Sequence, residues 1–263
     1  MLHGRKYLTI ARISLRNAWA YRAGTAFRLI LYALYVFVLF CVWKAVYRGG
    51  EIAGFSLTQM VWYVAFTEFI VFGCRTGIFG DLNEDIKSGD IAYQLNRPYH
   101  FLAYQAANAL GETAVNSCFY LLAAIALGLA LAGPLPHFAL WQLPPIALSM
   151  ALGMALNFLS MMALGLTAFY LEENTAFFLI WSKLVFMLGM FLPVEFLPDW
   201  LQTVARSLPF SYIAWAPARL AVSFDWAHFA ATVPLQALWV VLLAGLSALL
   251  YGKGVKRIHA NGG

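Results

Sequence analysis

Six long apolar stretches constrain this chain more than any other feature of its sequence. A helix that crosses the hydrocarbon core of a bilayer needs about 20 apolar residues. The windows that reach this length are residues 27–47, 57–79, 106–132, 141–171, 175–197 and 229–251. Charged residues make up only 11% of the chain, against about 25% in soluble domains, which is too few to cover a water-facing surface. We therefore predict an all-α integral membrane protein with six transmembrane helices in a domain of residues 27–252, and we expect no nucleic-acid partner.

The distribution of Lys and Arg predicts the orientation, because these residues are enriched on the cytoplasmic side of membrane proteins. With the N-terminus inside, ten fall in cytoplasmic segments: Arg5, Lys6, Arg12, Arg16, Arg22, Lys87, Arg97, Lys253, Lys256 and Arg257. Three fall in outer loops: Arg48, Arg206 and Arg219. We therefore expect both termini in the cytoplasm, with residues 253–263 as a basic tail.

Residues 1–26 are basic and lack the apolar core of a secretory signal. At about 100° per residue, Arg5, Arg12 and Arg16 share one stripe, with Trp19 on the flank. The opposite face consists of Tyr7, Ile10, Ser14, Ala18 and Tyr21. This pattern predicts an amphipathic helix on an anionic membrane surface. The alternative is an ordinary surface helix that packs on a partner protein.

Two connections carry structural signals. Glu172, Glu173 and Asn174 separate the fourth and fifth windows and predict a tight turn. The last outer connection, residues 198–228, is apolar but is broken by Pro198, Pro209 and Pro217. Its two pieces of roughly eight to ten residues are too short to span a bilayer. We expect them to form re-entrant or interfacial helices.

The loop of residues 80–105 is the most charged stretch after the N-terminus. Phe79, Leu82 and Ile86 share one helical face. The rest of this short helix carries Asp81, Glu84, Asp85 and Lys87. Gly89 is placed to end the helix in a left-handed conformation. Such a helix suits a groove on another protein, with apolar side chains giving the fit and carboxylates the orientation; a solvated connector is the alternative.

Three of the charged residues within the apolar windows, Glu68, Arg75 and Lys183, are candidates for a role in transport. Glu68 and Arg75 are seven residues apart and would lie almost on one helical face, about 10 Å apart along the axis. Charges in spans usually face the protein interior or a watery path. Glu68 is therefore a candidate for the transport pathway, whereas Arg75 either joins it or has a structural partner. Lys183 in the fifth window either contacts substrate or extends to the membrane surface.

The sequence gives no support for catalysis by this chain. The five histidines lie outside the windows or at their rims, and no G-x-x-x-x-G-K-[ST] motif for nucleotide phosphates occurs. Cys41, Cys74 and Cys118 lack paired or metal-type spacing. We expect no metal or cofactor in the chain, so active transport would draw on an ion gradient or on a separate ATPase.

Several of these segments carry a family resemblance. They are the basic helix ending at residues 17–22, the loop Asp-Ile-Lys-Ser-Gly-Asp-Ile-Ala-Tyr-Gln-Leu-Asn-Arg-Pro at residues 85–98, and the outer segment with Pro193, Pro209 and Pro217. Over essentially its whole length the chain resembles the ABC-2 type permeases, and most closely the branch associated with drug and viologen export. The resemblance implies a type V exporter-like fold with an N-terminal interfacial helix and outer re-entrant helices.

The same resemblance implies roles for residues and partners. The helix near residues 81–88 would be the coupling helix for an ABC ATPase, present in two copies with its own ATP and Mg²⁺. A second permease, identical or different, would complete a channel in the bacterial inner membrane. The resemblance supplies no substrate motif, but we predict that the route exports an amphipathic or hydrophobic substrate (drug-like, cationic or lipid-like) past aromatic residues such as Phe66, Phe69 and Phe72. The rival interpretations are an ion-driven secondary transporter or channel, and a non-transporting scaffold.

Overall fold

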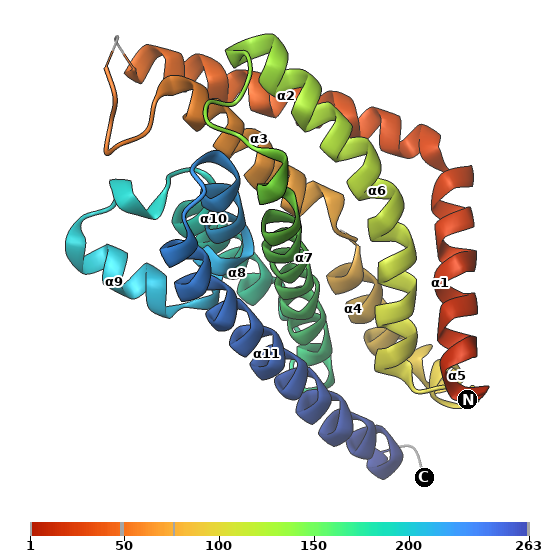
Figure 1. Cartoon of the computed structure of the whole chain (residues 1–263). Helices are drawn as coiled ribbons and strands as arrows, with labels where there is room; N and C mark the ends of the chain where they lie inside the picture. Colours follow the sequence, from red (N-terminus) through yellow and green to blue (C-terminus); the bar gives the residue numbers. More distant parts are fainter. Residues whose placement is uncertain (1, 48–49, 76, 262–263) are drawn as a thin grey trace.

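The computed structural model describes residues 2–47, 50–75 and 77–261. Across these ranges the regular secondary structure is helical, apart from one isolated bridge between Ile52 and Phe55 (Figure 1). The α-helices are α1 (Leu2–Ala20), α2 (Arg22–Val46), α3 (Leu57–Gly73), α4 (Ile78–Ser88), α5 (Ile91–Leu95), α6 (Phe101–Ala132), α7 (Leu143–Leu166), α8 (Thr175–Val185), α9 (Asp199–Ser207), α10 (Pro209–Val222) and α11 (Trp226–Asn261). Short helical turns are η1 (Leu140–Gln142), η2 (Thr167–Phe169), the π-helical η3 (Phe186–Met190) and η4 (Val194–Phe196).

Within the described ranges, five segments are long and apolar enough to cross a membrane. They are Gly24–Val46, Leu57–Ser88, Phe101–Ala132, Leu140–Phe169 and Trp226–Arg257. The prediction of an all-helical, multi-pass protein is confirmed. The window 175–197 instead contains the shorter apolar helix Thr175–Met190, because the helix ends in a π-turn shortly before Pro193. Proline has no N–H to continue a helical ladder.

The second window, expected to be one helix, is interrupted. Helix α3 ends at Gly73, Cys74 is extended, and α4 begins only at Ile78. Arg75 therefore lies beyond the end of the helix that carries Glu68. The prediction that these two charges share one helical face is wrong, because the period of 3.6 residues does not continue past Gly73.

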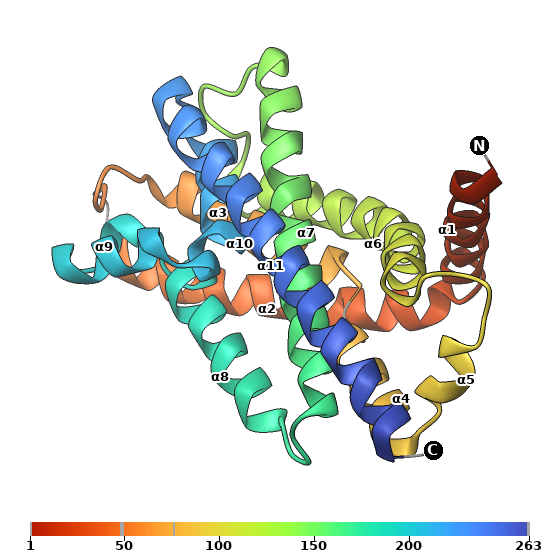
Figure 2. The same ribbon diagram turned by 90° about the horizontal axis from the view of Figure 1, so that it is seen from below.

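Helices α3 and α10 form the centre of the bundle. Most of α3 and all of α10 except Arg219 are buried, and α10 packs against α3, α7 and α11. Figure 2 shows α11 running obliquely across α7 and α10. The connection of residues 198–228 contains two helices as expected, but the second runs for 14 residues, straight through Pro217.

Close packing with α7 accommodates this proline. Pro217 has no N–H for the carbonyl of Ile213, four residues earlier. Gly153 of α7 lies against that carbonyl, so closely that a Cβ there would be 2.4 Å from the Ile213 oxygen. The tertiary packing of α10 thus explains why its helix is longer than the proline pattern predicts.

The face of α1 opposite the arginines packs on α6. The Ser14 hydroxyl donates to the Asn108 carbonyl oxygen (2.7 Å). A Cβ at Gly111 would be 2.2 Å from the Ala11 carbonyl oxygen. The alternative of a helix packed on protein therefore fits this face of α1, but the protein surface that it contacts is the chain's own α6 and not a partner. Arg5, Arg12 and Arg16 are exposed, as an interfacial position also requires, and Trp19 stacks on Phe119 (5.6 Å between ring centroids).

The turn predicted at residues 172–174 separates α7 from α8. Asn174 takes the N-cap position, but its side chain does not cap α8. Its Nδ2 donates instead to the Leu164 carbonyl oxygen and to Thr167 Oγ1 (3.2 and 3.0 Å). The Thr175 backbone N–H donates to Glu173 Oε1 (2.7 Å), and hydrogen bonds from Thr175 lower the pKa of Glu173.

The expected tail at residues 253–263 is not a separate segment. Helix α11 continues to Asn261, so Lys253, Lys256 and Arg257 extend from its last turns and are exposed. Residues 262 and 263 lie outside the described part of the chain.

Candidate functional site

The charged loop forms helix α4 as predicted, and Gly89 ends it with a left-handed φ of 85°. Its apolar face points into the chain itself. Leu82 is 0% exposed, and a Cβ at Gly165 of α7 would be 2.8 Å from the Leu82 Cβ. Phe79 stacks on Phe178 of α8 at 4.5 Å between ring centroids.

The expectation that Leu82 and Ile86 insert into a groove of a partner is therefore corrected. Leu82 is completely buried, and Ile86 is half-buried against the same internal cluster of side chains. Sequence periodicity revealed the apolar face but not its partner, which is α7. The exposed residues between Asp81 and Tyr93 are Asp81, Glu84, Lys87, Ser88, Gly89, Asp90, Ala92 and Tyr93.

Two further charged residues of α4, Asp85 and Lys87, have polar neighbours within the chain. Gln94 Nε2 donates to Asp85 Oδ2 (2.6 Å), which connects α4 to α5. Lys87 Nζ lies 3.9 Å from Glu173 Oε2 in the turn before α8. Tyr93 on α5 is 76% exposed and is thus a large aromatic side chain on this surface.

Arg75 joins α4 to α6. Its guanidinium lies 2.5 Å from Asp81 Oδ2 and 3.5 Å from Glu112 Oε2, and it also donates to Gln105 Oε1 (3.3 Å). The Arg75 backbone N–H donates to Thr113 Oγ1 (3.1 Å). Arg75 is buried, and each of its three side-chain partners is on α4 or α6. This geometry matches the structural-partner alternative for Arg75.

A polar cavity of about 350 Å³ lies beside this network. Arg75, Asp81, Glu84, Asp85 and Arg97 contribute charged side chains to its wall. Charges of both signs line this cavity. The end of the bundle that carries α4 is therefore hydrophilic next to the break between α3 and α4.

Glu68 is the unusual charged residue in the interior of the bundle. It lies on α3 and is 2% exposed, and its Oε1 has no hydrogen-bond partner among the described residues. The nearby Tyr32 hydroxyl donates to the Ala65 carbonyl oxygen instead (2.8 Å). Ionisable groups that are buried in spans without a partner are costly and are typical of transport pathways.

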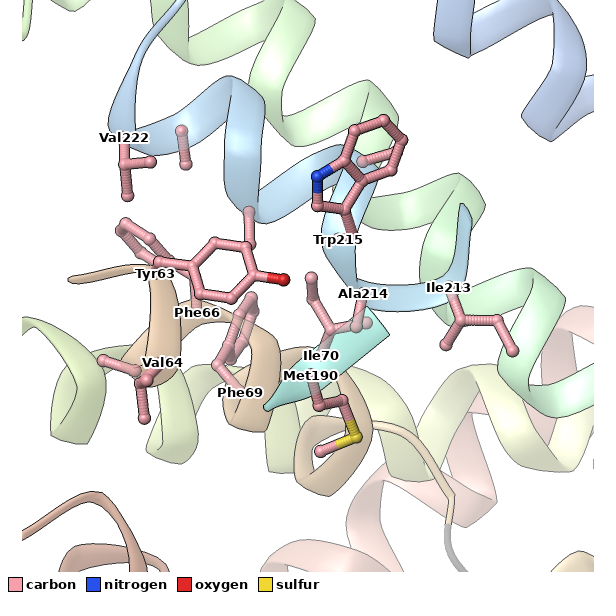
Figure 3. Close-up of a cluster of buried hydrophobic side chains, with 14 of the residues drawn as sticks. Tyr63, Val64, Phe66, Phe69, Ile70, Met190, Ile213, Ala214, Trp215 and Val222 are labelled. Carbon is pink, nitrogen blue, oxygen red and sulfur yellow. The ribbon is translucent and has the colours of Figure 1, made fainter. Parts of the chain in front are cut away.

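The three candidate pathway phenylalanines occupy different environments. Figure 3 shows Phe66 and Phe69 in the buried cluster where α3 meets α10. Phe66 also lines an apolar cavity of about 570 Å³ that reaches α6 and α7. Phe72 is half-buried and contacts the rings of Tyr32 and Tyr120 at 5.9 and 5.8 Å between centroids.

Lys183, the remaining pathway candidate, is exposed on α8. Its side chain points away from the core of this chain, as either the membrane-surface or the substrate-contact alternative requires.

The sequence patterns did not reveal one half-buried charge cluster. Glu195 Oε1 lies 3.2 Å from Arg219 Nε, and Glu195 Oε2 accepts a hydrogen bond from Trp215 Nε1 (2.9 Å). The Arg219 guanidinium also donates to the Ser223 carbonyl oxygen. Opposite charges in a largely apolar segment were the available signal, but the separation of 24 residues between Glu195 and Arg219 hid the pairing.

A comparison with protein-family models decides the classification. The model described as ABC-2 family transporter protein matches residues 29–262. The chain belongs to this family. No curated protein matches it. Membership in the ABC-2 family confirms the resemblance seen in the sequence and implies an ABC-type permease, the membrane component that pairs with an ABC ATPase subunit. Such a component is generally not itself catalytic, and the apolar helices agree with a multi-pass membrane protein.

Proposed function

We propose that this ABC-2 protein is the permease subunit of an ATP-driven exporter that moves an amphipathic or hydrophobic molecule out of the cytoplasm. Two permeases, identical or different, would form the route in the bacterial inner membrane, with two ATPase subunits carrying ATP and Mg²⁺. The family match supports this assignment together with one structural observation. Helix α4 is held firmly on the bundle by Leu82 while it exposes charged residues to solvent.

The proposal includes a sixth crossing and re-entrant outer helices. The helix Thr175–Met190 would extend about 24 Å at 1.5 Å per residue, a little less than the roughly 30 Å of a hydrocarbon core. The burial of α10 between α3 and α7 supports a segment that enters the bundle and returns to the same side. With both termini in the cytoplasm, α9 and α10 would then close the outer end of the pathway.

The proposed coupling starts at the exposed surface of α4 and α5. Glu84, Lys87 and Tyr93 would contact the ATPase, and closure of the two ATPase subunits on ATP would move α4. Because Leu82 packs on α7 and Arg75 binds residues of α6, this motion would reach both long helices. Phe66, Glu68 and Lys183 remain the candidates for contact with substrate.

Copurification of the ATPase tests this role. Glu84→Lys combined with Tyr93→Asp changes two side chains that are exposed in this chain, so the fold should persist. We expect at least a tenfold loss of bound ATPase and of transport-stimulated ATP hydrolysis. Lys253→Glu, an exposed charge reversal near the end of α11, is the matched control. If the double variant binds the ATPase as the control does, α4 and α5 are not the docking surface.

The unpaired carboxyl of Glu68 favours one rival function, a secondary transporter driven by protons or sodium ions. Such a transporter would move substrate in vesicles that contain this chain alone under an imposed ion gradient. The exporter proposal predicts flux only when the ATPase and ATP are present. Measuring both conditions in one vesicle preparation separates the two functions.

A further inference from the structure

A polar cavity of about 260 Å³ lies at the elbow between α1 and α2. Figure 1 shows these two helices meeting at an angle while α6 runs past both. The polar residues of its wall include Asn17 on α1, Thr25 and Arg28 on α2, and Asn108, Glu112 and Asn116 on α6. One water takes up about 30 Å³ of the liquid, so the cavity has room for a polar group of several heavy atoms.

The position of the elbow relative to the bilayer follows from its neighbours. The apolar segment of α2 begins at Gly24, next to the cavity. Trp19 and Tyr21 are largely exposed beside it, and these residue types concentrate at the level of lipid headgroups. The exposed arginines of α1 extend away from the same point. The cavity therefore lies at a membrane–water boundary, whichever side of the membrane that is.

Two residues of the cavity wall, Arg28 and Asn116, carry buried hydrogen-bond donors that have no acceptor among the described residues. Asn116 is 2% exposed, and its Nδ2 has no partner among the described residues. Arg28 Nε is also buried without a partner, while another guanidinium nitrogen of Arg28 donates to Thr25 Oγ1 (3.2 Å). Because buried donors without acceptors cost free energy, this wall is suited to an anionic group with several oxygens, such as a phosphodiester.

The same cavity is lined by the carboxylate of Glu112, which can accept further hydrogen bonds. Glu112 lies one helical turn before Asn116, and its only ion pair in the described chain is the 3.5 Å contact with Arg75. Arg75 is closer to Asp81, at 2.5 Å, so that one guanidinium serves two carboxylates. Arg28 and Glu112 form no ion pair with each other across the described ranges. One positive and one negative group thus face a single cavity, which is the complement of a zwitterion.

We propose that this elbow cavity binds the headgroup of a membrane phospholipid with a primary amine, of the phosphatidylethanolamine class. Arg28 and Asn116 donate to its phosphate oxygens, and Glu112 accepts from its ammonium group. A quaternary choline headgroup has no N–H to donate to Glu112, and a phosphatidylglycerol headgroup has no cation. The proposal does not depend on the export function, because it rests on the cavity and its unpaired groups alone.

Lipid retention by the purified full-length protein tests the site. The protein is mixed in detergent with equal amounts of phosphatidylethanolamine, phosphatidylglycerol and phosphatidylcholine of the same acyl chains, and bound lipids are identified by native mass spectrometry. We expect phosphatidylethanolamine to be retained at least fivefold over the other two. Arg28→Gln should abolish retention, and Glu112→Gln should remove the preference over phosphatidylglycerol. Arg12→Gln, an exposed arginine of α1 outside the cavity, is the matched control and should behave like the wild type.

Equal retention of the three lipids by the wild type, or equal effects of Arg12→Gln and Arg28→Gln, would overturn the proposal. If Glu112→Gln does not fold because Arg75 loses a partner, Glu112→Asp replaces it, since this variant keeps the carboxylate. The preference of the wild type among the three lipids then still tests the proposal. This headgroup chemistry is also found in a soluble compound, glycerophosphoethanolamine, and incubation with that compound distinguishes a soluble ligand from a membrane lipid. A retained adduct with the soluble compound, without retained phosphatidylethanolamine, would contradict a lipid ligand.

Discussion

The Arg75 guanidinium lies 2.5 Å from the Asp81 carboxylate and thereby bridges the break between α3 and α4. Arg75 is buried, whereas the Asp81 side chain is 51% exposed. Replacing Arg75 and replacing Asp81 should therefore lower the free energy of unfolding by different amounts. Arg75→Gln removes the ion pairs of a buried guanidinium with Asp81 and Glu112 and should lower the free energy of unfolding by about 2 kcal/mol, because both carboxylates keep access to solvent. Asp81→Asn should cost only about 1 kcal/mol, because Arg75 keeps Glu112 and Gln105.

Thermal unfolding of the purified protein in detergent measures both effects. The double variant should be no less stable than Arg75→Gln alone, since both changes remove the same contact. Equal destabilisation by the two single changes would show that the ion pair is not arranged as described.

Gly111 permits the close approach of α1 to α6. Gly111→Ala places a methyl group 2.2 Å from the Ala11 carbonyl oxygen, and the backbone has little room to yield. We expect about 1–3 kcal/mol of destabilisation from this overpacking and faster proteolysis of α1. Gly245→Ala on α11 is the control, because no atom lies within 4 Å of the new Cβ. Similar proteolysis of both variants would argue against the packing of α1 on α6.

Gln236 joins three helices through a fully buried side chain. Its Nε2 donates to the carbonyl oxygens of Ser149 and Tyr212 (3.1 and 2.9 Å), and its Oε1 accepts from the Ser149 hydroxyl (2.8 Å). Gln236→Leu removes these three hydrogen bonds, leaves the Ser149 hydroxyl without its acceptor and should cost about 1–3 kcal/mol in thermal unfolding. Adding Ser149→Ala should recover part of this loss because it removes the orphaned hydroxyl. No recovery in the double variant would contradict the direct hydrogen bond between the two side chains.

Replacing Leu82 should lower the stability of the protein without weakening its binding to the ATPase. Leu82→Ala removes a completely buried side chain between α4 and α7 and should cost about 2–5 kcal/mol. Ile86→Ala should cost less because Ile86 is only half-buried. Midpoints of thermal unfolding provide the comparison. If Leu82→Ala is as stable as the wild type yet loses the ATPase, Leu82 contacts the partner after all.

Glu68 offers a test of pathway function against structure. A buried carboxyl with an unpartnered oxygen is unfavourable for folding, so Glu68→Met should unfold at the same or a higher temperature. The same change should lower export several-fold if the carboxyl contacts substrate. Glu68→Gln keeps the shape and removes the charge, and it separates the contribution of charge from that of size. Unchanged export kinetics in both variants would exclude Glu68 from the pathway.

The sequence by itself determined the features that depend on local rules. Long apolar windows predicted a multi-pass helical protein, Gly89 predicted the end of α4, and residues 172–174 predicted the turn before α8. Each of these depends on backbone conformation or on transfer into lipid, which neighbouring residues specify without help from the rest of the chain.

The tertiary structure decided which surface each helical face meets. Periodicity identified the apolar face of α4, but lipid, a partner protein and α7 would all accept Leu82 equally well. The pairing of Arg75 with Asp81, in place of a shared face with Glu68, required the helix to stop at Gly73. A helical period carries information only along its own axis, and contacts between helices depend on shapes and charges that are brought together from distant parts of the chain.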